Sequence, residues 1–403
     1  MKIKYCRSCK NKSLTRVYSL GKQSLTGIFP SKKNSKVTAG QLSMVLCSKC
    51  KLLQLENNFN PNEMYGDNYG YMSSLNSSMV SHLKLKYEQL KSKYEFNFND
   101  NILDIGSNDG TFLSFFSKKF NLYGCDPTIK KFSKYYRKDI RQIKDFFSSK
   151  LFGNKKFKLI TAISMFYDLP DPLKFATEIN SILDNDGIWH IELSYMPMMI
   201  KNISYDTICH EHLEYYSLYS LKYLLSKAGL KIINLSFNQT NGGSIALDVT
   251  KKASKYKQCG YLINWILKSE KLNRYNTIKK QKEFFKACKT HKILLKKLIK
   301  NLQEEGKTIY GYGASTKGNV LLQYCNFNSK EIKYIGEVNK FKFNRYTPGS
   351  KIKIISEQKL KKMKPDYLLV LPWHFKDNIV KKEKAYLNSG GKLLFPLPDI
   401  EII

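Results

Sequence analysis

The sequence lacks the long apolar runs that would hold a chain in a lipid bilayer. No stretch of about 18 apolar residues occurs, so no membrane-spanning helix is predicted. The start, MKIKYCRSCK, has none of the apolar core that a secretory signal requires. We therefore expect a soluble, cytoplasmic protein with no membrane partner.

Acidic residues are scarce, since 33 Asp and Glu stand against 68 Lys and Arg, for a formal net charge of +35. Such a surplus can mark a protein that binds nucleic acid. The lysines are spread along the whole chain, however, and no DNA- or RNA-binding motif occurs. A lysine-rich composition of the kind that an AT-rich genome produces is the simpler interpretation, with attraction of a small anionic substrate as its by-product. We expect no nucleic-acid partner, and a zinc-containing nucleic-acid-binding protein is the alternative from another class.

The cysteines do not suit a disulfide framework, because their number, nine, is odd and the protein is expected to be cytoplasmic. Four of them form two C-x2-C pairs, Cys6 with Cys9 and Cys47 with Cys50. Each pair can present two thiolates on one turn, and two such turns make a tetrahedral four-sulfur site for Zn²⁺. Four protein ligands leave no open position, so we predict a structural zinc in a small module, residues 1–60. Its strands are expected near Val17–Leu20 and Gln41–Leu46.

Residues 61–250 alternate between apolar strands and helices. A helix is predicted from Ser78 to about Phe96, and NILDIGSNDG reads as a strand that ends in a glycine turn. TFLSFFSKKF, after that turn, predicts an amphipathic helix. Further strands are predicted in NLYGCDPT, KLITAISMF and GIWHIELSY, and an antiparallel pair in GLKIINLSFNQ and GSIALDVTKK. This order predicts an α/β domain with a doubly wound, Rossmann-like sheet.

Residues 251–403 begin with helical patterns and continue as a second, smaller Rossmann-like α/β domain. TIYGYGASTKGNVLL predicts a strand, a glycine turn and a helix, and KYIGEVN, PDYLLVLPW and GGKLLFPLP predict strands. Ser315 and Lys317 lie in the glycine turn at the start of the helix. Backbone N–H groups and a lysine there would suit a phosphate or diphosphate. A turn with a purely structural role is the alternative.

The first glycine turn, D-I-G-S-N-D-G, resembles motif I of class I S-adenosylmethionine (SAM) methyltransferases. Asp104 could accept a hydrogen bond from the cofactor's ammonium group, and Asp126, at the end of the next strand, could bind its ribose hydroxyls. The same acid would suit NAD, but the turn departs from G-x-G-x-x-G and carries Asp109 where a pyrophosphate would lie. SAM is therefore the predicted cofactor. The predicted cofactor-binding residues are Asp104, Gly106, Asn108, Asp126, Asp145 and Phe146.

Two segments, residues 145–146 and residues 64–79, each allow a second interpretation without a role in binding. Asp145 and Phe146 lie where such domains often contact adenine, yet a surface acid beside a core aromatic is the alternative interpretation. Residues 64–79, MYGDNYGYMSSLNSSM, are rich in Tyr, Ser and Asn. The stretch is interpreted either as a linker or as a lid whose hydroxyls reach a site.

The segment 207–216, TICHEHLEYY, concentrates ionisable side chains, with Cys209, His210, Glu211 and His212 in a row. A metal site would need a third ligand, and histidines two apart point to opposite sides of a helix. A cysteine nucleophile with a histidine base suits acyl transfer, which a SAM domain does not need. Two interpretations remain beside these: a loop tied by a His–Glu hydrogen bond, and acid–base chemistry in which one histidine removes a proton.

Taken in order, several motifs resemble the sugar-nucleotide C-methyltransferases that build branched deoxysugars. They are the two C-x2-C pairs, Y-x-S-S at 71–74, DIGSNDG, HEHLEYYS, GGS, GYGASTKGN, RYTPG and LPWH, and they cover essentially the whole chain. The resemblance implies a zinc-binding domain, a SAM domain and a C-terminal Rossmann-like domain, with the nucleotide-sugar between the last two. It implies SAM and structural Zn²⁺ as cofactors, and a dTDP-4-keto-deoxysugar-like substrate that is methylated at C3.

The resemblance also implies roles for individual residues. His212, which matches the second histidine of the family's H-E-H motif, would remove the proton beside the ketone, and Glu211 would orient it. Tyr71 or His210 would donate to the enolate oxygen. The substrate-binding residues that we expect are Tyr71, Ser74, Ser315, Lys317, Tyr346 and Trp373.

The chain departs from the family pattern at two positions. Cys209 stands where many members carry a tyrosine, and His374 follows Trp373 where asparagine is common. A thiol is a poor substitute for a phenol at an enolate, and Tyr215, Tyr216 or Tyr71 is expected to compensate. O-methylation of a nucleotide-sugar or a surface-glycan precursor is the alternative to C-methylation.

Overall fold

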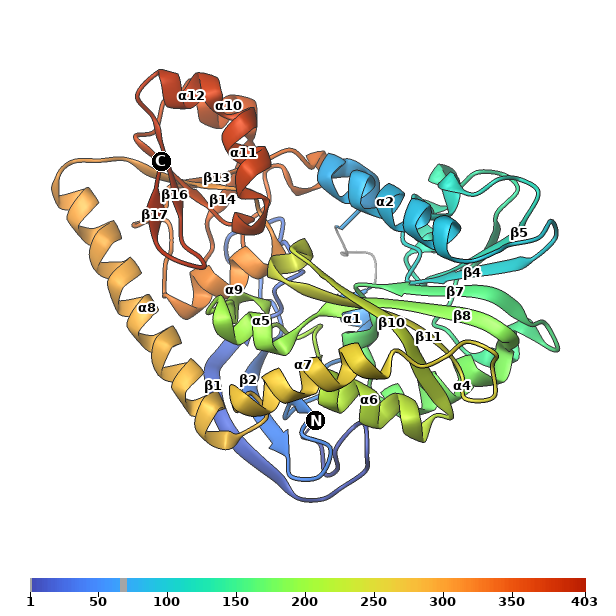
Figure 1. The fold of residues 1–403 in the computed structure, drawn as a ribbon. Coiled ribbons are helices and arrows are strands. Elements are labelled where there is room, and N and C mark those ends of the chain that lie inside the picture. Colours follow the sequence, from blue (N-terminus) through green and yellow to red (C-terminus); the bar gives the residue numbers. More distant parts are fainter. Residues whose placement is uncertain (1, 66–70) are drawn as a thin grey trace.

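Three β-sheets organise the chain, and the computed structural model describes them over residues 2–65 and 71–403 (Figure 1). Their strand orders are β1-β2-β3-β9, β10-β11-β8-β7-β4-β5-β6 and β14-β13-β12-β15-β16-β17. The second and third sheets carry helices and consist mainly of parallel strands, so the predicted α/β class is confirmed. None of the helices in the described ranges is long and apolar enough to cross a membrane.

The N-terminal sheet is antiparallel and takes its last strand from a distant part of the chain. Its strands are β1 (Leu14–Ser24), β2 (Ala39–Cys47), β3 (Leu53–Leu55) and β9 (Glu214–Tyr215). The two predicted strands are confirmed within β1 and β2. Strand β9 belongs to the TICHEHLEYY segment and pairs Tyr215 with Leu53. The sheet of the zinc module thus extends beyond residues 1–60 and holds this segment directly. The short helix α1 (Pro61–Met64) follows β3.

The central sheet has five parallel strands and an antiparallel pair. The strands are β4 (Asn101–Ile105), β5 (Asn121–Cys125), β6 (Arg141–Ile143), β7 (Phe157–Ile163), β8 (Leu183–Ser194), β10 (Leu230–Asn238) and β11 (Ser244–Lys251). The associated helices are α2 (Ser77–Lys93), α3 (Ile129–Phe132), α4 (Pro172–Ile182), α5 (Met196–Lys201) and α6 (Leu218–Lys227). The predicted helix near 78–96 and the predicted antiparallel pair are confirmed.

The helix predicted in TFLSFFSKKF is wrong, because only Leu113–Phe115 forms a single 3₁₀ turn there. The guanidinium of Arg137 donates to the carbonyl oxygens of Ser114 (2.9 Å) and Phe116 (2.8 Å). Those carbonyls are acceptors that a continuing helix would use for its own N–H groups. Ser114 Oγ also donates back to the Thr111 carbonyl, a local bond that competes with a helix.

The C-terminal domain follows two helices, α7 (Gly260–Leu272) and the long α8 (Ile278–Glu304), as predicted for residues 251–305. Its strands are β12 (Ile309–Tyr312), β13 (Tyr334–Glu337), β14 (Lys353–Ser356), β15 (Tyr367–Val370), β16 (Lys392–Phe395) and β17 (Glu401–Ile402). The helices are α9 (Thr316–Tyr324), α10 (Glu357–Lys362), α11 (Lys376–Lys382) and α12 (Lys384–Asn388). No strand was predicted from the sequence at the position of β14.

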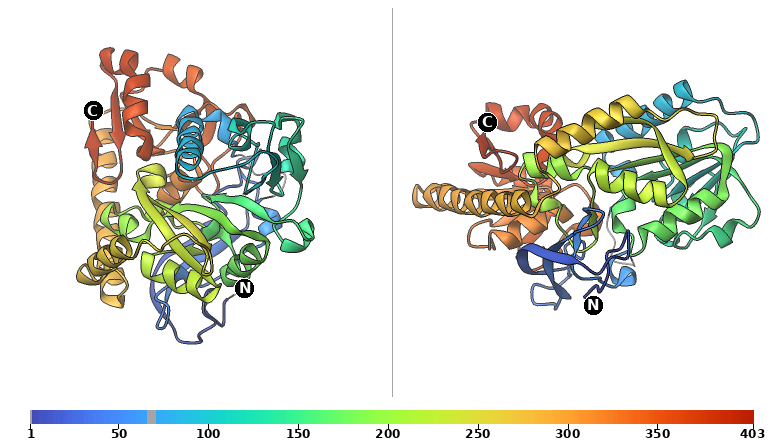
Figure 2. Two further views of the ribbon diagram at one scale, coloured as in Figure 1. Left: turned by 45° about the vertical axis from the view of Figure 1, so that its right-hand side comes forward. Right: turned by 60° about the horizontal axis from the view of Figure 1, so that its bottom comes forward.

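The N-terminal module is packed into both larger domains. Its strand residues Leu42 and Met44 belong to the same core as Phe284 of α8 and the C-terminal sheet. Its cysteine end, with Leu52, belongs instead to the core of the central sheet. Figure 2 shows the N-terminal strands between the two domains in its right-hand view. The module therefore fixes the position of one domain against the other.

Candidate active site

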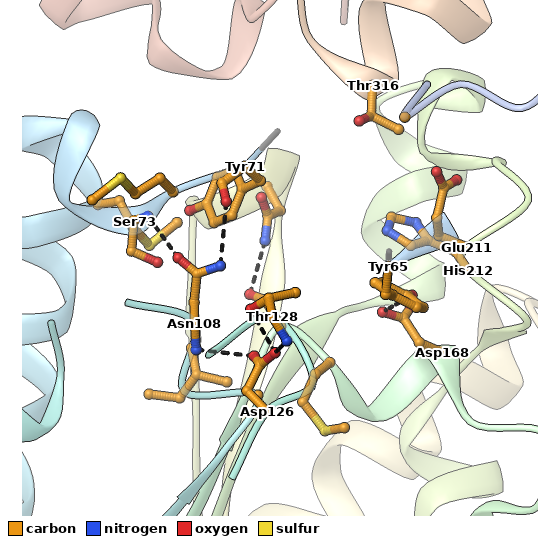
Figure 3. Close-up of a pocket in the computed structure, with 18 of the residues that line it drawn as sticks. Tyr65, Tyr71, Ser73, Asn108, Asp126, Thr128, Asp168, Glu211, His212 and Thr316 are labelled. Atoms are coloured by element: carbon orange, nitrogen blue, oxygen red, sulfur yellow. Dashed lines mark hydrogen bonds between the residues drawn. The ribbon is translucent and has the colours of Figure 1, made fainter. Parts of the chain in front are cut away.

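A cavity of about 1190 Å³ lies where the central sheet, the C-terminal domain and the TICHEHLEYY segment meet. The carboxyl ends of β4, β5 and β7 open into it from one side, and those of β12 and β13 from the other. Ligands of open α/β sheets bind at this edge. Figure 3 shows the lining side chains in two groups, one around Asn108 and Asp126 and one around Glu211 and His212.

The glycine turn after β4 fits a close ligand and a cation. Gly106 has a φ of +75°, and a Cβ atom there would lie 2.9 Å from Met165 Cγ, so only glycine suits this turn. Asp104 is buried, and its Oδ1 accepts a hydrogen bond from the Thr161 hydroxyl at 2.6 Å. Burial raises the pKa of Asp104 to about 7. A cationic group in the cavity would stabilise its charged form.

Asp126 closes the same turn from the end of β5. Its Oδ2 accepts from the backbone N–H of Asn108 at 2.9 Å, and its Oδ1 accepts from the N–H and the hydroxyl of Thr128 at 2.7 and 2.6 Å. Burial raises the pKa of this carboxyl as well. Asp145 and Phe146 line the cavity beside it. These predicted residues surround one space, and an adenosine with a cationic amino-acid arm fits the groups present.

The structure corrects the role given to Asp109. Its carboxylate does not line the cavity, because Oδ2 accepts from the N–H of Ser74 (2.9 Å) and Oδ1 from the hydroxyl of Thr111 (2.6 Å). Asp109 therefore ties the segment after residue 70 to the glycine turn and does not face a ligand. Ser74 is exposed and lies outside the cavity lining, whereas its neighbour Ser73 lines it and donates its N–H to Asn108 Oδ1 at 3.0 Å.

The tyrosine-rich stretch 64–79 reaches the cavity at both of its described ends. Tyr65, Tyr71 and Met72 line the cavity, which agrees with the lid interpretation for these residues. Tyr71 keeps part of its surface exposed, but desolvation of its phenol raises the pKa of Tyr71 to about 12, so the phenol keeps its proton and can donate it in a hydrogen bond. Residues 66–70 of the predicted linker or lid lie outside the described residues.

The opposite wall of the cavity is basic. Lys317, in the first turn of α9, is held by a hydrogen bond from its Nζ to the Asn241 carbonyl at 2.6 Å. Burial lowers the pKa of Lys317 and outweighs the charge of the buried Asp206, which acts in the opposite direction. Ser315 caps the helix by accepting the N–H of Gly318 at 2.9 Å. Lys342 and Lys382 also line this end.

His212 lies in the wall of this cavity with its protonation fixed by its partners. Its Nδ1 lies 2.8 Å from the carbonyl oxygen of Thr207, which can only accept, so Nδ1 carries the hydrogen and Nε2 is left unprotonated. Burial and the nearby charge of Lys317 lower the His212 pKa to about 3. The imidazole is therefore neutral at physiological pH. Tyr167 packs against the ring with 4.4 Å between centroids.

Glu211 also lines the cavity, and it is held from the N-terminal module. Its Oε2 accepts the hydroxyl of Thr26 at 3.2 Å. A Cβ atom on Gly27 would come within 2.7 Å of Glu211 Oε1, so a larger residue there would displace the end of this side chain. Glu211 and His212, the last two residues of the H-E-H motif, thus line the same cavity.

Other predicted site residues lie behind the wall. His210 is fully buried, with its Nε2 3.4 Å from the Gly40 carbonyl and its ring against Phe59, so it does not reach the cavity. Trp373 donates its indole N–H to Asp206 at 2.7 Å and lies outside the lining. Tyr346 donates its backbone N–H to the Pro30 carbonyl and also lies outside the cavity lining. Cys209 is buried in the apolar core, so its thiol is not a group of the cavity.

Asp168 lines the same cavity as His212 and Glu211, and the sequence did not predict it as a site residue. Asp168 lies just after β7 and accepts the Tyr65 hydroxyl at 2.7 Å (Figure 3). Burial raises the pKa of Asp168 well above its ordinary value, with the charge of Glu211 as a further cause. His374 also lines the cavity, and burial lowers its pKa. The sequence feature that could have indicated Asp168 as a site residue is its position shortly after the third predicted strand.

The four paired cysteines come together as predicted. Their Sγ atoms all lie within 4.8 Å of one another, and the Cys6–Cys50 and Cys9–Cys47 pairs are 3.5 Å apart. A tetrahedral zinc with Zn–S bonds of about 2.3 Å needs sulfur–sulfur distances of about 3.8 Å, so the cluster fits this metal. Arg7, between two of the cysteines, lies 3.7 Å from Glu214 of β9, and both side chains are buried. The zinc site is thereby linked to the segment that carries His212.

Three family models match successive parts of the chain. "Putative zinc binding domain" matches residues 6–65, "Methyltransferase domain" matches 79–235, and "C-methyltransferase C-terminal domain" matches 239–398. The C-methyltransferase NovU of Streptomyces niveus is 26% identical over 410 residues, which cover 100% of this chain and 97% of that protein.

Solved structures resemble a smaller part of the chain. A SAM-dependent methyltransferase from Clostridium acetobutylicum is 14% identical, with a TM-score of 0.33, and the match covers 42% of this chain and 89% of that one. A complex of LepI with SAM is also 14% identical, with a TM-score of 0.33, and the match covers 45% and 54%.

Proposed function

We propose that this SAM-dependent methyltransferase with a zinc-binding N-terminal domain acts at carbon, and that it methylates the carbon beside the ketone of a nucleotide-activated sugar. The observation that carries this proposal is the neutral His212 in the cavity that also holds the cofactor-binding acids and Lys317. Bound SAM would supply an electrophilic methyl group, held at the Asp104 and Asp126 end.

The proposed base is His212. A proton on a carbon beside a ketone is acidic only when the enolate is stabilised, and an unprotonated Nε2 can accept it. The C–H bond breaks, its proton goes to Nε2, and the electron pair passes into the enolate. Nδ1–H stays on the Thr207 carbonyl and keeps the ring oriented. Glu211, the neighbouring carboxylate, is proposed to balance the imidazolium that forms.

The enolate oxygen needs a hydrogen-bond donor that already points into the cavity. Tyr71 and Lys317 are the proposed candidates, since both line the cavity, and the raised pKa of Tyr71 keeps the proton on its phenol. Of the three tyrosines expected to compensate for Cys209, Tyr71 lines the cavity, while Tyr215 and Tyr216 are buried outside its lining. Tyr71 is therefore the phenol that we assign to this role.

An anionic substrate group would suit the basic wall. Burial disfavours the charged form of Lys317, and the first turn of α9 adds backbone N–H groups beside it. A diphosphate would supply negative charge that stabilises the ammonium group. It would also cancel the charge that lowers the His212 pKa, so substrate binding would make the imidazole a stronger base.

The experiment that tests this function uses the purified chain with SAM and a panel of nucleotide-activated 4-keto-6-deoxysugars in D₂O. We expect solvent deuterium at the carbon beside the ketone without SAM, and a C-methyl signal in the product with SAM. Neither exchange nor product across the whole panel would overturn the proposal. An O-methyl signal would establish the alternative, methylation of a hydroxyl.

A further inference from the structure

Glu337 is a cavity-lining carboxylate to which the proposed reaction gives no role. It ends β13, the second strand of the C-terminal Rossmann-like unit, after the glycine turn and α9. Its Oε2 accepts the N–H of Ala314, in the glycine turn, at 3.0 Å. Its Oε1 accepts the N–H groups of Val338 at 2.7 Å and Asn339 at 3.0 Å. The side chain is 10% exposed and lies at the edge of the cavity.

The same arrangement occurs at the other end of the cavity. Asp126 directly follows the second strand of its own unit, β5, and one of its oxygens accepts a glycine-turn N–H, that of Asn108. Its other oxygen accepts the N–H two residues further on, that of Thr128. Glu337 repeats both bonds with Ala314 and Asn339. An acid at this place in a Rossmann-like unit is the one that accepts hydrogen bonds from ribose hydroxyls.

Both carboxylates have acceptor capacity left over. A carboxylate offers about four acceptor positions, and within residues 2–65 and 71–403 Asp126 and Glu337 each accept three hydrogen bonds. The two differ in their surroundings, because Lys342 Nζ lies 3.6 Å from Glu337 Oε2 and donates to the Ala314 carbonyl at 2.8 Å. A lysine beside the acid suits a ligand that carries phosphate as well as sugar hydroxyls.

We propose that Glu337 accepts a hydrogen bond from a hydroxyl of the pentose of the substrate's nucleoside diphosphate, with Lys342 and Lys317 facing the phosphates. This inference rests on the proposed function, because it needs a nucleotide in the basic end of the cavity. It adds a specificity-determining residue: the cavity then holds two pentose acceptors, Asp126 for the cofactor and Glu337 for the substrate. The substrate's nucleotide is then selected by its pentose hydroxyl as well as by the charge of its phosphates.

The test measures nucleotide affinity by titration calorimetry, with saturating S-adenosylhomocysteine to fill the cofactor end. The probes are UDP and dTDP, each compared with its 2′,3′-dideoxy counterpart, which lacks any pentose hydroxyl that Glu337 could bind. A hydrogen bond to a charged acceptor predicts that the dideoxy forms bind about tenfold to a hundredfold more weakly. This comparison uses the unaltered chain, so it does not depend on the folding of a variant.

A Glu337→Gln variant should bind the complete and dideoxy nucleotides with nearly equal affinity. Glu304→Gln, at an exposed position of α8, is the matched control and should keep the full difference. Equal binding of both nucleotide forms by the unaltered chain overturns the role of Glu337 and leaves the proposed function standing. No binding of any nucleoside diphosphate overturns the proposed function and this inference with it.

Discussion

The two ends of the cavity share a local architecture and have opposite charge. Each end is formed by a strand, a glycine turn and a second strand that closes in an acid, Asp126 in one unit and Glu337 in the other. At the first end the other ionisable side chains are mainly acidic, including Asp104 and Asp145, whereas at the second end they are mainly basic, including Lys317 and Lys342. The backbone motif thus sets the place of a ligand, and the side chains around it set which charge the ligand carries.

Burial disfavours the charged form of ionisable side chains at both ends of the cavity. It raises the pKa of Asp104 to about 7 at the acidic end. It lowers the pKa of Lys317 at the basic end, and with the charge of Lys317 it lowers that of His212 to about 3. Groups at both ends therefore tend toward neutrality in the empty cavity. A cation at one end and an anion at the other would restore their charges, and the predictions below separate these two effects.

Removal of the zinc should disturb the basic end of the cavity more than the acidic end. The cysteine cluster is linked to the His212 segment through Arg7, Glu214 and the pairing of β3 with β9. Replacement of Cys47 and Cys50 by serine should abolish turnover and lower the melting temperature, because the module has little core of its own. Binding of S-adenosylhomocysteine, measured by calorimetry, should persist. Loss of this binding together with turnover would show that both ends depend equally on the zinc and would contradict the comparison.

The His212→Ala variant should lose turnover by about 10²- to 10⁴-fold, the usual contribution of a positioned base. Solvent exchange at the carbon beside the ketone should fall in parallel, as followed by NMR in D₂O. Binding of S-adenosylhomocysteine should stay unchanged, since His212 lies at the opposite end from Asp104 and Asp126. Retained exchange would remove His212 from the role of base.

The Lys317→Met variant should weaken binding of the nucleotide-sugar by about tenfold to a hundredfold, because a charged hydrogen bond to the phosphates is lost. It should also raise the His212 pKa, because the positive charge that disfavours the imidazolium is gone. The acidic limb of the pH profile for solvent exchange should then move to higher pH. Lys300→Met, at an exposed position of α8, is the control and should leave the profile unchanged.

The smallest expected effect is the pH dependence of cofactor binding. With an Asp104 pKa of about 7, the carboxyl is neutral below this pH and charged above it. A cationic ammonium group favours the charged form, so SAM affinity should rise up to about tenfold per pH unit below neutrality and level off above it. Calorimetry across this range measures the slope. An Asp104→Asn variant should bind more weakly and lose the slope, and an unchanged slope would contradict the assignment.

Much of the architecture could be predicted from local pattern. The strand–turn segments, the antiparallel pair, helices α2 and α8 and the four-cysteine cluster are confirmed because each depends on residues close in sequence or on metal-ligand spacing. The domain matches confirm a SAM-dependent methyltransferase with a zinc-binding domain. The helix after Gly110 was predicted wrongly because Arg137, more than twenty residues away, takes its carbonyls.

The site was harder to predict, because membership of a motif does not say which way a side chain points. His210, Glu211 and His212 are consecutive, yet Glu211 and His212 line the cavity while His210 packs behind it against Phe59. Asp109 stands in the glycine turn but bonds to Ser74. Asp168 has no motif around it and reaches the site only because β7 ends there.

The sequence alone determined the chemistry that the chain carries: four thiolates at zinc spacing, acids at the ends of two strands, a histidine beside a glutamate and a lysine in a glycine turn. Local spacing is enough for that, because each feature lies within a few residues. Tertiary structure alone decided which of these groups share a cavity and in which protonation state. Strand β9 joins the zinc module to the His212 segment, and burial beside Lys317 keeps His212 neutral, because packing and electric charge act through space and not along the chain.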